Sequence, residues 1–259
     1  MPSHSDNAKL FTDLHQVGEP LILFNVWDAG SARAVASAGA KAIATGSWAV
    51  AASHGFEDGE QLPLNLALAN LERIASAVEL PVSFDLEGGY GADVAAVGRN
   101  VVDAINAGAV GFNLEDASSG RLRTIDDQVA RLSAAREAAD RTGVAAFINT
   151  RTDAFFTPGV DQSDEALFDE VVRRAAAFKK VGADGLFVPG AVSEALIGRL
   201  VKAVALPLNV MILPDSPPLE NLIQLGVSRV SHGPGPYLAT MRALEAQARA
   251  SLGATSDLS

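Results

Sequence analysis

The chain contains no cysteine among its 259 residues. It therefore has no thiolate nucleophile, no disulfide and no cysteine-ligated metal. Aromatic residues make up only 6% of the sequence, so the core must be built mainly from Ala, Val, Leu and Ile. A chain of this length can do so, because folding removes most of its unfolded-state surface from water. Any chemistry must depend on carboxylates, hydroxyls, histidine, arginine, lysine or a bound metal.

Positive charge is also scarce, since 20 Lys and Arg residues are outnumbered by 31 Asp and Glu residues, giving a net charge of -11. Nucleic acids and anionic membranes are bound through clustered Lys and Arg, so we expect neither as a partner. The N-terminal residues show no basic and then apolar leader, and no apolar run reaches the ~18 residues that span a bilayer. We expect a cytoplasmic protein.

The sequence does contain a repeated join between a helical pattern and a short apolar run. Five joins use a glycine, which ends a helix in the left-handed conformation without a Cβ penalty. Two others use Leu-Pro, because proline ends a helix and is tolerated at the start of a strand. With one run near the N-terminus, these joins predict eight strands, at residues 21–24, 42–45, 82–85, 111–114, 145–148, 185–188, 208–211 and 227–231.

Helical patterns separate these strands, for example over residues 126–141 and 164–181. The strands are apolar throughout, as a parallel sheet covered on both faces requires. We therefore predict one α/β domain, a (β/α)8 TIM barrel over residues 1–259, with a core at about 20–245. An open doubly wound sheet is the alternative. A last helix is expected over 237–252, followed by a polar tail over 253–259.

Acidic side chains follow neighbouring predicted strands. Asp85 and Glu87 come at the end of the third strand and Glu115 at the end of the fourth, while Asp58 lies in the loop after the second. In a barrel the carboxyl ends of the strands form the active site. Three carboxylates there, without a cation, would repel one another. An all-oxygen set suits Mg²⁺ or Mn²⁺, although capping of helices or pairing with arginine would also explain these residues.

Other polar and aromatic residues come at the same predicted strand ends. We expect Trp27 and Trp48 to be pocket walls, with packing alone as the alternative. We expect His232 to face the mouth, in contact with substrate or a loop, with a structural role as the alternative. A further set is expected to orient the carboxylates or Arg151, namely Asp28, Asn149, Asp153 and Asn209. A Schiff-base mechanism would place a lysine at a strand end. None of the five lysines is expected there, so we exclude that mechanism.

Five segments occur in order along the chain: 25–29 (NVWDA), 45–60, 85–91 (DLEGGYG), 114–116 (LED) and 151–154 (RTDA). Through them the chain resembles the isocitrate lyase and phosphoenolpyruvate mutase superfamily. The resemblance implies a Mg²⁺-dependent barrel that acts on small 2-oxo or 2-hydroxy acids through an enolate of pyruvate or a similar acid. It also implies homo-oligomers, tetramers or dimers, often with exchange of the eighth helix between subunits.

The resemblance also implies roles for individual residues. Asp85 would contact the metal and the substrate, with Asp58, Glu87 and Glu115 around the water shell of the ion. Backbone N–H groups of Gly46, Ser47 and Trp48 would bind the carboxylate and carbonyl of the substrate. Arg151 would bind the leaving group or its charge. We accordingly expect Arg151, Ser47 and Asp58 to be catalytic. The expected substrate contacts are Trp27, Gly46, Ser47, Trp48, Asp85, Arg151, Asn209 and His232.

The segment at 117–123 departs from the patterns of both main branches. Lyases of isocitrate and methylisocitrate resemble one another in a loop with Lys-Lys-Cys-Gly-His, whereas this chain has Ala-Ser-Ser-Gly-Arg-Leu-Arg and no cysteine. The phosphonate branch has Ser-Gly-Leu and a loop asparagine, where this chain has Gly46-Ser47-Trp48 and no loop asparagine. We therefore predict a lyase or decarboxylase that breaks a carbon–carbon bond. The alternatives are a phosphoenolpyruvate or phosphonopyruvate mutase or hydrolase, and a non-catalytic binder of a small dicarboxylate.

Overall fold

The computed structural model describes residues 3–118, 120–157, 160 and 163–253 of the chain. Eight parallel strands form one sheet in the order β1-β10-β9-β8-β7-β4-β3-β2. Their bounds are β1 Leu21–Leu23, β2 Ile43–Ala44, β3 Val82–Asp85, β4 Gly111–Glu115, β7 Phe147–Arg151, β8 Gly185–Val188, β9 Leu208–Met211 and β10 Arg229–Ser231. All eight overlap the predicted apolar runs, although β7 begins two residues later than its run and continues three residues beyond it.

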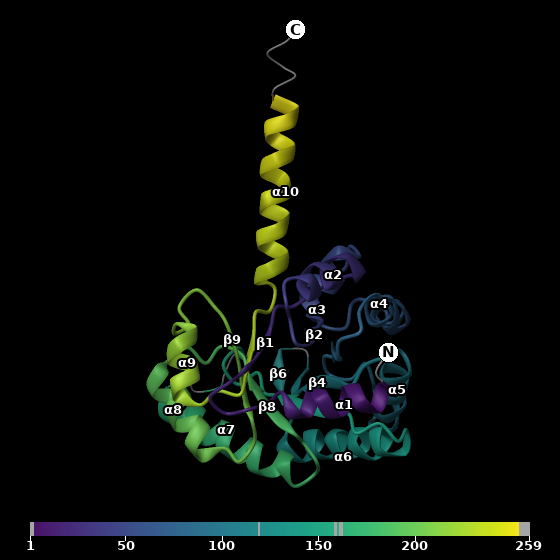
Figure 1. Cartoon of the computed structure of the whole chain (residues 1–259). Helices are drawn as coiled ribbons and strands as arrows, with labels where there is room; N and C mark the ends of the chain where they lie inside the picture. The colour runs from purple at the N-terminus through teal and green to yellow at the C-terminus, as the bar shows by residue number, and fades with distance from the viewer. Residues whose placement is uncertain (1–2, 119, 158–159, 161–162, 254–259) are drawn as a thin grey trace.

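The sheet curls into a nearly closed barrel. Just beyond the two edge strands, the backbone N–H of Val26 donates to the carbonyl of Ala44 at 2.9 Å, and Val26 forms a parallel bridge with Thr45. Strand and helix alternate along a single domain (Figure 1). The predicted (β/α)8 barrel is therefore confirmed and the open doubly wound sheet is excluded.

The helices surround and extend this barrel. Those described are α1 His4–Asp13, α2 Ala29–Ser37, α3 Ser47–Ser53, α4 Leu64–Ala77, α5 Val94–Asn106, α6 Ile125–Arg141, α7 Asp164–Lys179, α8 Glu194–Ala203, α9 Leu219–Leu225 and α10 Gly235–Gly253. Side chains at the N-cap fix several starts, as where Thr124 accepts a hydrogen bond from Asp127 N before α6. In the described part of the chain, no helix combines the length and apolarity needed to cross a membrane.

Three features differ from the sequence-based expectation. The segment expected as a loop after Glu115 contains a short antiparallel hairpin, β5 Ala117–Ser118 and β6 Arg121–Leu122. The helix α3 begins directly after the second strand, because the turn at Gly46 leads straight into it. The last helix begins at Gly235, two positions before the expected start, and the expected polar tail falls almost wholly outside the described residues.

Helix α1 packs against the barrel next to β7 and supplies an aromatic floor. Phe11 of α1 is fully buried and contacts Phe147 edge to face, at 5.8 Å between ring centroids. His15 stacks on Phe147, and burial lowers the pKa of His15 to about 3, so its ring is neutral. Gly111 leaves room for the floor, because a Cβ there would lie 2.8 Å from the Phe11 ring. The amino ends of the strands are therefore sealed, and the site must lie at the other ends.

Helix α10 behaves differently from the other long helices. It projects away from the barrel (Figure 1), and among its residues only Pro236 is buried. Its outer apolar residues Leu244 and Leu252 are 58% and 73% exposed. Beside its root, an apolar groove of about 510 Å³ lies between β1 and α2, lined by Ile22, Phe24, Ala34, Val35, Ala38, Gly39 and Ala40. Both the helix and the groove leave apolar surface uncovered in one chain.

Candidate functional site

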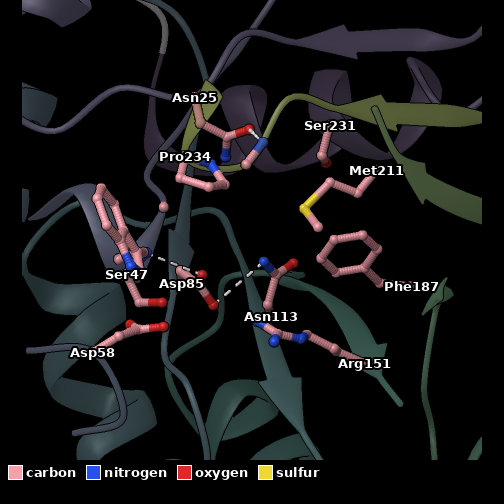
Figure 2. A pocket seen from close by; sticks show the side chains of 13 residues that line it. Asn25, Ser47, Asp58, Asp85, Asn113, Arg151, Phe187, Met211, Ser231 and Pro234 are labelled. Atoms are coloured by element: carbon pink, nitrogen blue, oxygen red, sulfur yellow. Dashed lines mark hydrogen bonds between the residues drawn. The ribbon is translucent and has the colours of Figure 1, made fainter. Parts of the chain in front are cut away.

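A pocket of about 160 Å³ opens at the carboxyl ends of the barrel strands (Figure 2). This is the end at which barrel enzymes bind their substrates. Strands or the segments that directly follow them supply every lining residue except Asp58, which lies in the loop after α3. The lining residues are Asn25, Gly46, Ser47, Trp48, Asp58, Asp85, Asn113, Arg151, Phe187, Met211, Ser231, Gly233 and Pro234.

Asp85 is the carboxylate at the base of this pocket. As the last residue of β3 it is 8% exposed. One of its oxygens accepts the backbone N–H of Ser47 at 3.1 Å, and the other lies 3.4 Å from the amide nitrogen of Asn113. Its own backbone N–H donates to the Thr45 hydroxyl at 2.9 Å. The carboxylate is thus held from both sides while it lines the pocket.

Ser47 connects the Asp85 carboxylate to a second acid. It is the first residue of α3, so its N–H is one of the helix-terminal donors that favour an anion. Its side chain bonds to Asp58. Partial desolvation of Asp58, and then the charge of Asp85, raise the pKa of the Asp58 carboxyl above its usual value. Asp58 is therefore easier to protonate than an ordinary surface acid.

Glu87 belongs to a strained cluster just beyond Asp85. Glu60, Glu87 and Tyr90 have φ values of 62°, 50° and 52°, which non-glycine residues rarely adopt. They hold one another in place, since Glu87 accepts the Tyr90 hydroxyl and the Glu60 N–H, and Glu60 accepts the Tyr90 N–H. Burial of Glu87, together with the charge of Asp85, raises the pKa of Glu87 to about 7. Strain of this kind is typical of functional sites.

Glu115 and Arg151 lie opposite each other on adjacent strands. Arg151 Nη1 is 3.0 Å from Glu115 Oε2, and its Nε donates to Asp153 at 2.8 Å. Burial by itself would lower the pKa of Arg151, but Glu115, Asp153 and Asp85 outweigh it and raise that pKa. Burial raises the pKa of Glu115 well above the usual range, although Arg151 opposes the change. Arg151 therefore carries a charge that two carboxylates already partly balance.

The donor set at this end is chemically suited to a hard divalent cation. The charge of Asp85 raises the pKa of Asp58, Glu87 and Glu115, which shows that these carboxylates act on one another through space. Within the described ranges, no three acidic or histidine side chains converge as a complete ligand set. The arrangement fits an ion that is held directly by Asp85 and retains much of its water shell, as Mg²⁺ does.

The structure places six of the expected site residues on the pocket wall: Gly46, Ser47, Trp48, Asp58, Asp85 and Arg151. Asp58 also borders a second cavity, of about 390 Å³, beside the β5–β6 hairpin, and Glu115 lines this second cavity but not the first. Glu87 lies behind Asp85, in the strained cluster. Asp58 thus separates the two cavities.

Three expected substrate contacts do not line the pocket. Trp27 packs edge to face on Tyr237, with ring centroids 5.1 Å apart, because α10 begins beside it. Asn209 points into the barrel, where it accepts the Ser231 hydroxyl at 3.2 Å. His232 turns its ring toward Phe24 and the Leu23 carbonyl, so only the backbone near it reaches the site. Direct substrate contact by these three side chains is not supported by this geometry.

Sequence reasoning missed several lining residues. Asn113 lies two positions before Glu115 on β4, and this period-two spacing would have placed it on the inner face. Phe187 and Met211 gave no signal, because apolar residues in apolar strands look like core. Ser231 is the last residue of β10, and Gly233 and Pro234 lie in the segment that follows it.

Arg229 is a further unpredicted residue, buried at the barrel axis below the pocket. It is 1% exposed, and its Nε and Nη1 have no hydrogen-bond partner among the described residues. Its Nη2 donates to Asn113 Oδ1 at 3.3 Å, and Asn149 donates to the same oxygen at 2.9 Å. These two donors orient the Asn113 amide with its NH₂ group toward Asp85. Burial lowers the pKa of Arg229 to about 9, and Asp85 opposes this, so Arg229 remains charged at neutral pH.

Comparison with known proteins gives a consistent result. A family model described as phosphoenolpyruvate phosphomutase matches residues 11–252. An uncharacterized protein of Mycobacterium tuberculosis (strain H37Rv) is 34% identical, over 93% of this chain and 88% of that protein. An oxaloacetate decarboxylase of Pseudomonas entomophila (strain L48) is 28% identical, over 93% and 83%. A crystal structure from Burkholderia cenocepacia J2315, provisionally named a phosphonomutase, has a TM-score of 0.90 at 52% identity and covers 94% of this chain and 99% of its own.

Proposed function

The chain belongs to the phosphoenolpyruvate phosphomutase family, within a superfamily of lyases and mutases, and from this premise we propose that it is a Mg²⁺-dependent enzyme. We propose further that it is a lyase or decarboxylase that breaks a carbon–carbon bond in a small 2-oxo or 2-hydroxy acid. The observation that carries this proposal is the carboxylate Asp85, held by Ser47 and Asn113 at the base of a pocket that Arg151 also enters. Mn²⁺ would be accepted in place of Mg²⁺.

Binding of such an acid would use two groups of residues at the site: the carboxylates around Asp85 and the guanidinium of Arg151. Asp85 would hold the ion directly, with Asp58, Glu87 and Glu115 around its water shell. When bound, the ion would withdraw negative charge from the 2-oxo carboxylate end of the substrate. The Ser47 N–H already donates to Asp85, so the next backbone N–H at the start of α3, that of Trp48, would donate to a carbonyl or carboxylate oxygen of the same end.

Arg151 would bind the second anionic group of the substrate. For oxaloacetate this is the C4 carboxylate, and the bond that breaks joins C3 to C4. The electron pair of that bond passes to C3 and on to the C2 oxygen as the enolate forms, while C4 leaves as CO₂. Glu115 and Asp153 share the charge of Arg151, so the arginine orients the carboxylate without fully neutralising it. Because Arg151 binds the ionised carboxylate of the substrate less strongly, less binding energy is lost as negative charge leaves that carboxylate in the transition state.

Asp58 is suited to proton transfer at C3 after the bond breaks. Its raised pKa gives it a larger protonated fraction near neutral pH than an ordinary aspartate has. The Ser47 hydroxyl, bonded to Asp58, would orient the acid and share its proton. Trp48 is 38% exposed at the pocket rim, where its ring would limit the access of water.

The test is turnover of a panel of 2-oxo, 2-hydroxy and phosphono acids with Mg²⁺. We expect pyruvate to be released from oxaloacetate or a related oxo acid, and chelation or Asp85→Ala to abolish release. Asp169→Ala, which removes an exposed aspartate on α7, is the matched control and should be as active as the wild type. Asp85→Asn should weaken Mg²⁺ binding with little loss of stability.

Other outcomes of this panel identify the alternatives. The relative at 52% identity carries a phosphonomutase name, which favours phosphorus–carbon bond cleavage as the second candidate. Phosphate released from phosphonopyruvate, or its conversion to phosphoenolpyruvate, would establish that candidate instead. Metal-independent binding of a dicarboxylate without any turnover would identify a binding protein.

We also propose that the protein is a homo-oligomer, a dimer or tetramer, in which α10 is exchanged between subunits. The support is that α10 projects from its own barrel (Figure 1), while an apolar groove beside its root is open between β1 and α2. Light scattering should give a multiple of 26.8 kDa. Leu244→Glu on the exposed helix should shift the mass toward the monomer. The expectations of a cytoplasmic location and of no nucleic-acid or membrane partner stand as predictions.

A further inference from the structure

The pocket has two unlike walls. Asp85 and Asp58 lie with Ser47 along one side, whereas Phe187 and Met211 line the opposite side, with Arg151 below Phe187 (Figure 2). These two apolar side chains come from β8 and β9. Ligand pockets commonly combine a few polar groups with apolar side chains, and here the two kinds are separated on different sides.

Met211 reaches into the pocket because of a glycine across from it. It is the last residue of β9, and its side chain points toward Phe187 (Figure 2). Gly233 has a φ of +52°, and a Cβ there would lie 2.5 Å from the Met211 sulfur. Any larger residue at position 233 would displace the methionine. The local backbone therefore fixes where the thioether lies.

Two polar side chains near this wall, those of Asn25 and Ser231, already form hydrogen bonds within the protein. Asn25 accepts the N–H groups of His232 and Gly233, each at 2.9 Å, and donates to the Thr45 carbonyl at 2.9 Å. The Ser231 hydroxyl donates to Asn209 at 3.2 Å. A charged substrate group pressed against Met211, away from Arg151, would therefore lose water without gaining a partner from Asn25 or Ser231.

An alkyl group at the same position has the opposite balance. Transfer of the alkyl group from water to contact with the phenyl ring of Phe187 and the thioether of Met211 is favourable, and the flexible thioether adapts to small changes of shape. Arg151 lies below Phe187, with its Cζ 5.8 Å from the centre of that ring. A carboxylate received by Arg151 therefore leaves the adjoining carbon of the substrate beside the apolar wall.

From this arrangement we infer that the substrate bears a short alkyl substituent on the carbon between its 2-oxo group and the anionic group that Arg151 receives. Phe187 and Met211 are the residues that select this substituent. The inference rests on the proposed function, since it names the class of acid that the same site takes: a 3-alkyl 2-oxo dicarboxylate or the corresponding 2-hydroxy acid.

The experiment compares oxaloacetate with its 3-methyl and 3-ethyl derivatives at saturating Mg²⁺, corrected for spontaneous decarboxylation. Each buried methylene should raise kcat/KM by roughly fourfold. Met211→Leu keeps the wall apolar and should keep this preference. Met211→Gln has nearly the same length but a polar end, so it should remove the preference and leave the melting temperature close to that of Met211→Leu.

The results that overturn the inference are specific. Oxaloacetate preferred over both alkyl derivatives, or a preference that is the same in the Gln and Leu variants, would show that the wall does not select the substituent. If no member of the series is turned over, the proposed function fails, and ligand binding then decides the inference. Under that outcome, 3-methylmalate should stabilise the protein against heat more than malate does, and equal or smaller stabilisation would refute the inference.

Discussion

The two walls of the pocket are built from two parts of the same barrel and differ in kind. The strands β3, β4 and β7 end in Asp85, Glu115 and Arg151; the charges of Glu115 and Asp85 raise the pKa of Arg151, while burial raises the pKa of Glu115 against the effect of Arg151. The strands β8 and β9 instead place Phe187 and Met211 in the pocket. On this comparison, the polar wall would stabilise the charge that develops in the reaction, and the apolar wall would select the alkyl substituent of the substrate.

The largest effect is expected from removing the positive charge of the polar wall. Arg151→Met leaves Glu115 and Asp153 without their partner, so we expect kcat/KM to fall by at least ~100-fold and the free energy of unfolding to fall by about 3 kcal/mol. Steady-state kinetics and chemical denaturation measure the two losses. Adding Glu115→Gln to this variant should recover part of the stability but none of the activity. Recovery of activity would mean that Arg151 serves only to balance Glu115.

The metal-free protein should become less stable as the pH rises. The pKa of Glu87 is about 7 in the folded protein, against a usual value of 4.5, so the folded state binds more protons than the unfolded state between these pH values. This contribution is complete below pH 4.5 and is lost as the pH rises through 7, with a size of up to about 3 kcal/mol. Denaturation with chelator at a series of pH values measures it.

Two controls sharpen the pH experiment. Glu87→Gln cannot ionise, so its stability should depend less steeply on pH over the same interval. Mg²⁺ should restore stability to the wild type at the higher pH, because a cation offsets the repulsion among the carboxylates. A wild-type profile that is flat, or that rises with pH in this interval, would show that the Glu87 carboxylate is not desolvated as described.

The smallest loss of activity is expected from substitution of Arg229, which acts on the polar wall through Asn113. Arg229 comes from β10, yet its hydrogen bond to Asn113 orients the amide that faces Asp85. Arg229→Met should lower kcat about tenfold, and Arg229→Lys, which keeps the charge, should lose less. Phe11→Leu is the control, because Phe11 packs near Arg229 but is not bonded to Asn113. Equal losses of kcat in the Met and Phe11 variants would indicate a role in packing alone.

Much of the polar wall could be predicted from the sequence. Acidic residues at the ends of apolar runs stand out, because charge at a strand end has no role in the core, and so Asp85 and Glu115 were found. The role expected of Arg151 came from the resemblance to the superfamily. The exceptions were residues judged by strand position alone. Trp27, Asn209 and His232 occupy strand ends, but their side chains turn toward Tyr237, the barrel interior and Phe24.

The apolar wall could not be predicted, for a physical reason. A methionine or phenylalanine at the inner face of a strand has the same local pattern whether it packs against other side chains or lines a cavity. Only the neighbouring strand decides which, as Gly233 does for Met211. Arg229 is similar, because an arginine within a short apolar strand gives no indication that it lies at the barrel axis.

By itself the sequence determined the barrel and the end at which the site lies, because glycine and proline joins, apolar runs and acidic strand ends are local properties of the chain. The tertiary structure decided which carboxylates lie close enough to interact, which of them pair with Arg151, and that an apolar wall faces them. Those outcomes depend on distances between residues far apart in the sequence, and such distances are set only when the strands close around a common axis.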